Sequence, residues 1–265
     1  MRLKIHQSTR YSFDEAPSFG LQQVRMTPKT SHQQRVISWD ITVVGGRKEL
    51  SFEDHHHNVT ELVSFDNSGT SLELLCEGEV ELSDALGVVG RHRGPTPLWL
   101  YRKVTPRTEA GPGVRNLVQG VETGDLLDAL HSLSARICDA VAYEVGASHP
   151  YWTAEDAIQA GTGVCQDHTH IFLACARRLG LPARYVSGYL MLDDRSSQEA
   201  MHAWAEAYVP DLGWVGFDVS NAISPDTRYV RVATGLDYSD AAPVSGTRIG
   251  GAGEQLDVQI DVAQQ

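Results

Sequence analysis

The amino-acid sequence predicts an α+β fold, with a half built of antiparallel strands followed by a half in which helices come before strands. In residues 1 to about 88, apolar side chains recur at every second position, as in half-buried strands. Between about 125 and 180 the apolar residues step by three and four, which is typical of helices. Beyond residue 183 the strand pattern returns. Because helices and strands do not alternate, a doubly wound parallel sheet is disfavoured.

The first half, residues 1–90, is expected to form one β-rich domain. Three runs of residues share one parity each: Leu3, Ile5, Thr9, Tyr11 and Phe13; Ile37, Trp39, Ile41 and Val43; and Leu72, Leu74, Cys76, Val80 and Leu82. Gly45-Gly46 and Asn67-Ser68-Gly69 supply turn chemistry between them. Strands joined by short turns indicate an antiparallel sandwich or a barrel-like sheet.

Residues 91–116 have a different composition and are expected to link two domains. Prolines and basic residues dominate the stretch: Pro95, Pro97, Pro106 and Pro112, with Arg91, Arg93, Arg102, Lys103, Arg107 and Arg115. Prolines at this density oppose both helices and central strands. The basic side chains are expected to be solvated, with an acidic partner or the acidic neighbouring domain as the alternative.

The remaining residues, 117–265, are expected to form the second domain. Its first helix is predicted from Asp125 to Val145, and a short helix over 154–160 follows Thr153, which is a suitable N-cap. A third helix runs from Val164 to Leu179, before Gly180 and Pro182. The predicted strands are 183–192, 202–209, 214–219 and 256–262.

Composition and charge argue against several classes of function. The formal net charge of −12 over 265 residues disfavours a general nucleic-acid or anionic-membrane surface. No apolar run approaches the ~18 residues of a membrane helix, and the N-terminus lacks the apolar core of a signal peptide. We therefore expect a cytoplasmic protein with no membrane or nucleic-acid partner, whose oligomeric state is not predicted. The four cysteines contain no C-x-x-C pair and are too sparse for a disulfide framework.

One cysteine, Cys165, stands where a reactive thiol would benefit from its surroundings. It follows the Gly161-Thr162-Gly163 turn and begins the predicted third helix. Unpaired backbone N–H groups and the positive end of the helix dipole favour a thiolate there. The same N–H groups can bind an oxyanion. The position therefore offers a nucleophile together with part of an oxyanion hole.

A thiol nucleophile needs a base, and His202 is the candidate chosen by context. It opens the strand HAWAEAYV, where it shares a face with Trp204, and Asp218 ends the following strand. A symmetric four-residue loop over 210–213 would place Asp218 opposite Ala205. A bulge or a shifted register is then needed to bring the carboxylate to the imidazole. The spacing allows a Cys-His-Asp triad without establishing it.

Two histidine clusters raise the alternative of a metal site. Cys165, His168 and His170 form C-x-x-H-x-H, but residue 170 points about 140° away from residue 168 on a helix, so one ion cannot easily bind all three. In His55-His56-His57, only the first and last share a face of a strand. Asp193-Asp194 lacks a calcium-loop pattern. We expect no metal and no cofactor.

Three motifs carry a resemblance to a known family. "GVCQDHTHIFLACARRLGLPARYVSGY", "MHAWAEAYVPDLGWVGFDVSN" and "GLDYSDAAPVSG" resemble successive motifs of the bacterial transglutaminase-like family, which belongs with the papain-like thiol enzymes. "RMTPKTSHQQRVISWDI" and "EDHHHNVTELV" resemble its N-terminal β-rich domain. The resemblance implies a papain-like core of helices on an antiparallel sheet. It also implies Cys165 as nucleophile, His202 as base and Asp218 as the residue that orients the base.

The same resemblance suggests two further residues and exposes four departures. Trp152 is the candidate for a second oxyanion donor, through its indole N–H, and Trp204 is a second candidate for substrate or oxyanion contact. Where this chain has His168-Thr169, the family usually has an apolar or aromatic residue followed by Ala, and where it has Val219-Ser220 the family usually has Pro-Thr. Gly is common at the position of His57, and Arg is common at the position of Leu236. The departures remove no member of the triad and bear on substrate preference.

Three classes of function follow. The first is a thiol enzyme that acts on amide or peptide bonds of a peptide or protein through an acyl-thioester. Within it, a cysteine protease or amidase ranks ahead of an acyl-transferring transglutaminase, because bacterial members of this type look more like hydrolases. The second class is a catalytically silent peptide-binding module, and the third is a metal-binding scaffold.

Overall fold

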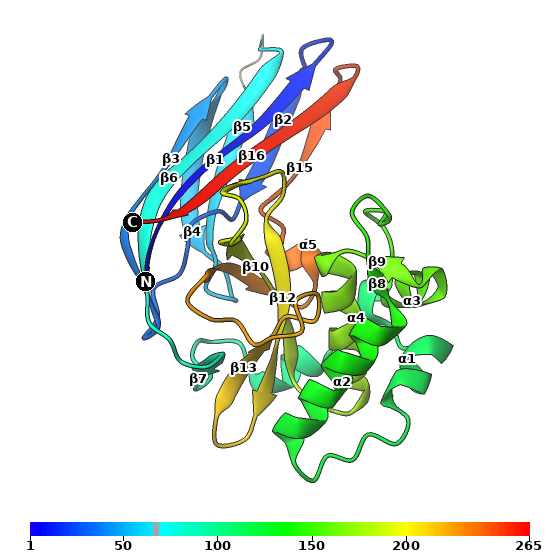
Figure 1. Ribbon diagram of the computed structural model, residues 1–265. Coiled ribbons are helices and arrows are strands. Elements are labelled where there is room, and N and C mark those ends of the chain that lie inside the picture. The colour runs from blue at the N-terminus through cyan, green and yellow to red at the C-terminus, as the bar shows by residue number, and fades with distance from the viewer. Residues whose placement is uncertain (66–68) are drawn as a thin grey trace.

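The computed structural model describes residues 1–65 and 69–265 and has a β-sandwich above a core of helices on an antiparallel sheet (Figure 1). This confirms the predicted α+β fold. One sandwich sheet has five strands in the order β11-β16-β1-β6-β3, and the other has four in the order β15-β2-β5-β4. Their bounds are β1 (Arg2–Phe13), β2 (Phe19–Val24), β3 (Gln34–Val44), β4 (Gly46–Glu53), β5 (Val59–Phe65), β6 (Ser71–Leu82), β11 (Ser197–Gln198), β15 (Val244–Ile249) and β16 (Glu254–Gln264).

The core sheet has the strand order β14-β10-β12-β13-β7. Its strands are β7 (Val88–Gly90), β10 (Ala183–Leu190), β12 (His202–Val209), β13 (Gly213–Phe217) and β14 (Tyr229–Gly235). The helices are α1 (Pro112–Val118), α2 (Leu126–Ala140), α3 (Ala154–Ala160), α4 (Cys165–Arg178) and the short α5 (Tyr238–Ala241), and β8 (Ala142–Tyr143) pairs in parallel with β9 (Thr162–Gly163).

The predicted period of two is clearest in β1 and β6. Alternate residues of both strands are buried, and Cys76 is among them. In β3 the pattern breaks at Ile37, which is 38% exposed, because a bulge between Val36 and Ser38 shifts the register by one residue. The predicted turn at Asn67-Ser68-Gly69 lies largely outside the described residues.

The buried face of β1 serves two different cores. Near the start of the strand, Leu3 and Ile5 join the large cluster that also contains the apolar residues of α2 and α4. Near its end, Tyr11 and Phe13 join the cluster between the two sandwich sheets. One half of the five-stranded sheet therefore packs against the core, and its other half packs against the four-stranded sheet.

The C-terminal residues return to the sandwich. β16 pairs antiparallel with β1 along its whole length, and β15 pairs with β2. In Figure 1 both ends of the chain accordingly lie side by side. The predicted domain boundaries at residues 90 and 116 stay predictions. The sandwich sheets also contain β15 and β16, which come from the segment predicted to belong to the second domain.

The proline-rich stretch 91–116 is more ordered than its composition predicts. It contains two 3-10 turns, Leu98–Arg102 and Pro106–Thr108, and Pro112 occupies the first turn of α1, where a missing N–H costs nothing. The buried Arg177 of α4 donates to the carbonyl of Tyr101 and to the hydroxyl of Thr108. The segment is thus fastened to the central helix.

The helices largely follow the sequence predictions. Thr153 caps α3, as predicted, and the Asp156 carboxylate accepts the backbone N–H of Thr153 in return. Asp125, where the first helix was predicted to begin, is the N-cap of α2. α2 ends at Ala140 rather than at Val145, because Ala142 and Tyr143 form β8 and pair with β9. α4 is buried from Asp167 to Arg177 and lies against β12, whose alanines at 203, 205 and 207 let a helix approach closely.

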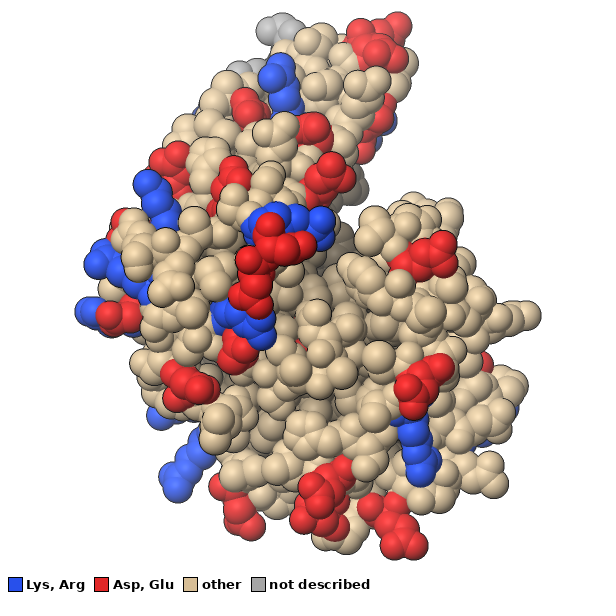
Figure 2. Space-filling view, viewed as in Figure 1, with Lys and Arg blue, Asp and Glu red and all other residues tan. Residues whose placement is uncertain are grey.

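No helix in the described part of the chain is long and apolar enough to cross a membrane. Acidic and basic side chains are interspersed over the face shown in Figure 2, and the surface is hollowed where the sandwich meets the helical part of the core.

Candidate active site

The local chain path at Cys165 depends on a glycine and a carboxylate. Gly161 ends α3 at φ 70°, in the left-handed region, and Gly163 leaves no room for a Cβ, which would lie 2.9 Å from the Cβ of Asp167. The Asp167 carboxylate accepts the N–H of Val164 at 2.8 Å, and the Val164 carbonyl accepts the N–H groups of Asp167 and His168. Within the described residues this leaves the N–H groups of Cys165 and Gln166 without a partner.

The register of β12 and β13 places Asp218 on the same face as His202. Val209 pairs with Gly213, and Ala205 pairs with Phe217, so the next residue, Asp218, falls opposite Trp204. This differs by one residue from the symmetric loop considered above, and a one-residue shift moves a side chain to the other face of a sheet. Positive φ angles at Asp211 (70°) and Gly213 (85°) make the tighter turn.

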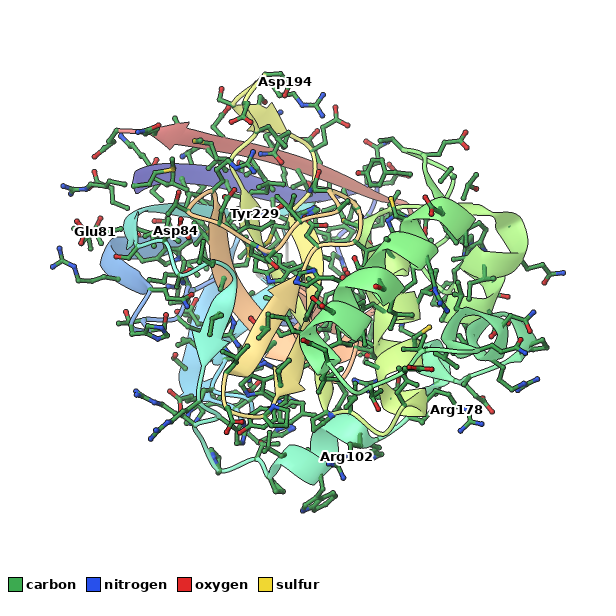
Figure 3. All side chains as sticks on the ribbon, turned by 60° about the horizontal axis from the view of Figure 1, so that its bottom comes forward. Glu81, Asp84, Arg102, Arg178, Asp194 and Tyr229 are labelled. Atoms are coloured by element: carbon green, nitrogen blue, oxygen red, sulfur yellow. The ribbon has the colours of Figure 1, made fainter. Side chains whose placement is uncertain are left out.

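The carboxylate of Asp218 is fully buried and held by three side chains. Its Oδ2 lies 2.6 Å from Nε2 of His202, and it accepts the hydroxyl of Tyr229 at 2.7 Å and the side-chain amide of Asn221 at 2.7 Å. Burial alone raises the pKa of Asp218, but these hydrogen bonds outweigh burial and lower it. The carboxylate therefore stays ionised. Figure 3 shows Tyr229 inside the molecule, whereas Arg102, Arg178 and Asp194 lie at its edge.

The imidazole of His202 lies between this carboxylate and the thiol. Because Asp218 occupies Nε2, the other ring nitrogen is free for Cys165, which borders the same cavity and interacts electrostatically with the imidazole. Burial lowers the pKa of His202, but Cys165 and Asp218 together raise it to about 10. The site favours an imidazolium beside the buried carboxylate of Asp218.

Three of the residues that depart from the family pattern, His168, Thr169 and Ser220, make hydrogen bonds at this site. The Nδ1 of His168 lies 2.8 Å from the hydroxyl of Ser220, and its Nε2 lies 2.9 Å from the carbonyl of Val141. Thr169 donates its hydroxyl to the carbonyl of Cys165 at 2.7 Å. His168 thus ties α4 to the end of α2 and to the turn that follows Asp218.

The two tryptophan candidates, Trp152 and Trp204, lie outside the lining of the cavity beside Cys165. Trp204 is buried beside His202, with ring centroids 6.2 Å apart, and its edge meets Tyr229. Trp152 is partly buried in the loop before α3, and its carbonyl accepts a long bond from Arg107 at 3.5 Å. Neither residue lines the cavity of about 360 Å³ that Cys165 and His202 border. Their roles stay predictions.

The histidines considered above as metal ligands each contact a different residue. His170 accepts the backbone N–H of Tyr238, His56 contacts the hydroxyl of Tyr101, and His57 contacts Glu53. Across the described residues, no group of three or more His, Cys, Asp or Glu side chains is arranged to hold a metal ion.

Sequence reasoning missed Asn221 and Tyr229. Asn221 follows Asp218 by three residues, which is a spacing for local side-chain contacts in a turn. Tyr229 belongs to β14, eleven residues away, and only the tertiary fold brings it to the carboxylate.

Comparison with known proteins agrees with this architecture. A model of the transglutaminase-like superfamily matches residues 114–219, and a model of the bacterial transglutaminase-like N-terminal region matches residues 3–81. A solved structure of a candidate cysteine protease from Cytophaga hutchinsonii is 21% identical and superposes with a TM-score of 0.79, over 99% of this chain and 90% of that one. This likeness concerns the fold.

Two relatives span nearly the whole chain. An uncharacterized protein of Mycobacterium leprae (strain TN) is 24% identical over 99% of both chains. One of Mycobacterium tuberculosis (strain H37Rv) is 24% identical over 98% of this chain and 92% of its own. With both regions present in order, the chain belongs to the bacterial transglutaminase-like family.

Proposed function

We propose that this protein is a cysteine hydrolase that cleaves amide or peptide bonds, with Cys165 as nucleophile, His202 as general acid and base, and Asp218 as the residue that orients His202. The observation that carries the proposal is the placement of one imidazole between a buried carboxylate and a thiol at a helix start, beside a cavity. These are the parts of a Cys-His-Asp triad.

In the acylation step the thiolate of Cys165 attacks the substrate carbonyl carbon, and the carbonyl π electrons move to oxygen. The free N–H groups at the start of α4 lie where they can stabilise this oxyanion. The imidazolium of His202 then gives its proton to the leaving amine as the C–N bond breaks. The products are a free amine and an acyl-thioester on Cys165.

In the second step water attacks the thioester. His202, now neutral, accepts a proton from the water, and the C–S bond breaks to release the carboxylic acid and restore the thiolate and imidazolium. Asp218 keeps Nε2 engaged through both steps, so the proton moves at the nitrogen that faces Cys165.

The fold and family support a thiol enzyme of this class, and the solved relative is presented as a candidate cysteine protease. The test is digestion of a complex peptide pool by the wild type and by Cys165→Ser, with new termini identified by mass spectrometry. The proposal requires new free carboxyl termini with the wild type alone. Identical peptide profiles, together with no covalent capture of Cys165 by peptide electrophiles, would indicate a silent binding module instead.

A further inference from the structure

The buried face of β1 changes character where it passes the active site. Apolar residues precede and follow the change, but Gln7 and Thr9, only 2% and 3% exposed, interrupt them. The Gln7 side chain is fixed by donating to Thr9 and by accepting the hydroxyl of Tyr189 on β10. A buried polar pair between two apolar cores suggests that this part of β1 has a role besides core packing.

Both residues border the cavity beside Cys165, so the sandwich forms one of its walls. Tyr11 of β1 and Leu256 and Val258 of β16 also line it. In the β1–β16 ladder, Thr9 pairs with Val258 and Tyr11 pairs with Leu256, so the four side chains form one continuous patch. Leu256 is 55% exposed, so its side chain is accessible to a ligand in the cavity.

Three tyrosines from separate segments line the same cavity: Tyr11 of β1, Tyr185 of β10 and Tyr238 of α5. Within the described residues, none of the three hydroxyls makes a hydrogen bond. Burial raises the pKa of each phenol, to about 12 for Tyr11, so all three remain protonated donors. Hydroxyls without protein partners beside a nucleophile are available to a substrate.

The charge of the cavity is one-sided. Among the described residues that line the cavity, Glu199 is the one Asp or Glu, and there is no lysine or arginine. A substrate carboxylate entering here would lose its hydration. The imidazolium of His202 would not compensate this loss, because it is already paired with Asp218. The size, about 360 Å³, is within the range of ordinary ligand pockets.

We propose that this cavity is the acyl-side pocket of the enzyme, built jointly by the sandwich and the core, and that it selects an uncharged side chain. The hydroxyls of Tyr11, Tyr185 and Tyr238 donate to the acceptor groups of the substrate, while Leu256 and Val258 contact its apolar part. This inference rests on the proposed function, since it takes Cys165 as the nucleophile.

The test uses dipeptidyl fluoromethyl ketones that differ only in the residue next to the electrophile, which is leucine, phenylalanine, glutamine or aspartate. The rate of Cys165 labelling is measured by intact mass. The three uncharged probes should label the wild type at least about tenfold faster than the aspartate probe.

Variants then locate the pocket. Tyr185→Phe and Tyr11→Phe should each slow the glutamine probe roughly fivefold to tenfold, the loss of one hydrogen bond, with little change in thermal midpoint. Leu256→Asp should slow the leucine and phenylalanine probes. The matched controls are Tyr151→Phe, at a tyrosine 79% exposed, and Leu50→Asp, at a leucine 49% exposed on β4, and neither residue lines the cavity.

Iodoacetamide, which needs no pocket, separates the two hypotheses. If it labels Cys165 preferentially but the aspartate probe matches the neutral ones, or the cavity variants behave as the controls do, the pocket assignment is wrong and the nucleophile stands. If iodoacetamide shows no preference for Cys165, the proposed function itself fails.

Discussion

The hydroxyl of Tyr229 donates to the Oδ2 of Asp218 at 2.7 Å, the same carboxylate oxygen that contacts Nε2 of His202 at 2.6 Å. One oxygen thus joins three strands, β12, β14 and the end of β13. The orientation of the imidazole therefore depends on a residue outside the proposed triad.

Removal of that hydroxyl should impair catalysis without removing a catalytic group. Tyr229→Phe is expected to lower kcat/KM about tenfold, the cost of one hydrogen bond to a charged group, while Asp218→Asn should lower it by roughly 10⁴. The measurement is hydrolysis of any peptide found in the digest. Equal rates for Tyr229→Phe and the wild type would show that Asn221 alone suffices to hold the carboxylate.

The four thiols should differ sharply in reactivity. Burial raises the pKa of Cys76 to about 12 and also raises the pKa of Cys175, whereas Cys165 faces the imidazolium of His202. We expect iodoacetamide at neutral pH to alkylate Cys165 first, as followed by peptide mapping. Labelling of all four at one slow rate would contradict the assignment of the nucleophile.

The protonation of His202 should appear in the pH dependence of stability. An unfolded imidazole titrates near 6.5, and the folded one at about 10. The raised pKa contributes stability that is complete below about 6.5 and is lost as the pH rises through about 10. The difference in free energy of unfolding between the wild type and His202→Gln should therefore shrink over this window. A difference that stays constant from pH 6 to 10.5 would disagree with the charged state.

The bond between His168 and Ser220 should behave as a coupled pair. Ser220→Ala is expected to cost about 1 kcal/mol in the free energy of unfolding. The same substitution in a His168→Leu background should cost almost nothing, because its partner is already gone. Denaturant unfolding of the four proteins closes the cycle. Additive effects would mean that the two side chains act independently.

Partition of the acyl-enzyme separates hydrolysis from transfer. With a peptide substrate and excess cadaverine, the carboxylic acid should dominate and the amine adduct should remain minor. Transfer needs a second channel that admits an amine and excludes water. Mass spectrometry gives the product ratio, and a dominant amine adduct would make the enzyme a transglutaminase in activity.

Local patterns in the sequence were sufficient for most elements and for the triad candidates. The parity of β1, the cap at Thr153 and the position of Cys165 all depend on neighbours within a few residues. The side of the sheet on which Asp218 lies was not predictable, because it depends on whether the loop after Val209 has three residues or four. The same limit applies at Ile37, where a single bulge reverses the exposure.

Partners distant in sequence were harder still. Nothing in the periodicity of residues 254–264 reveals that they pair with β1, and nothing near Asp218 points to Tyr229. The wall of the cavity formed by β1 and β16 was therefore not predictable from the sequence. Gln7 was the one local sign, because it is a polar residue at a buried position of β1.

The pairing of β16 with β1 has a consequence for how the chain folds during synthesis. Leu256 and Val258 are translated after the core strands and helices, so the edge of β1 that pairs with β16 stays unpaired until these residues have been made. Contacts between residues some 250 positions apart also raise the contact order, which slows folding. The wall of the cavity therefore forms from the strand that is made last among the described elements, whereas Cys165, His202 and Asp218 belong to segments made earlier.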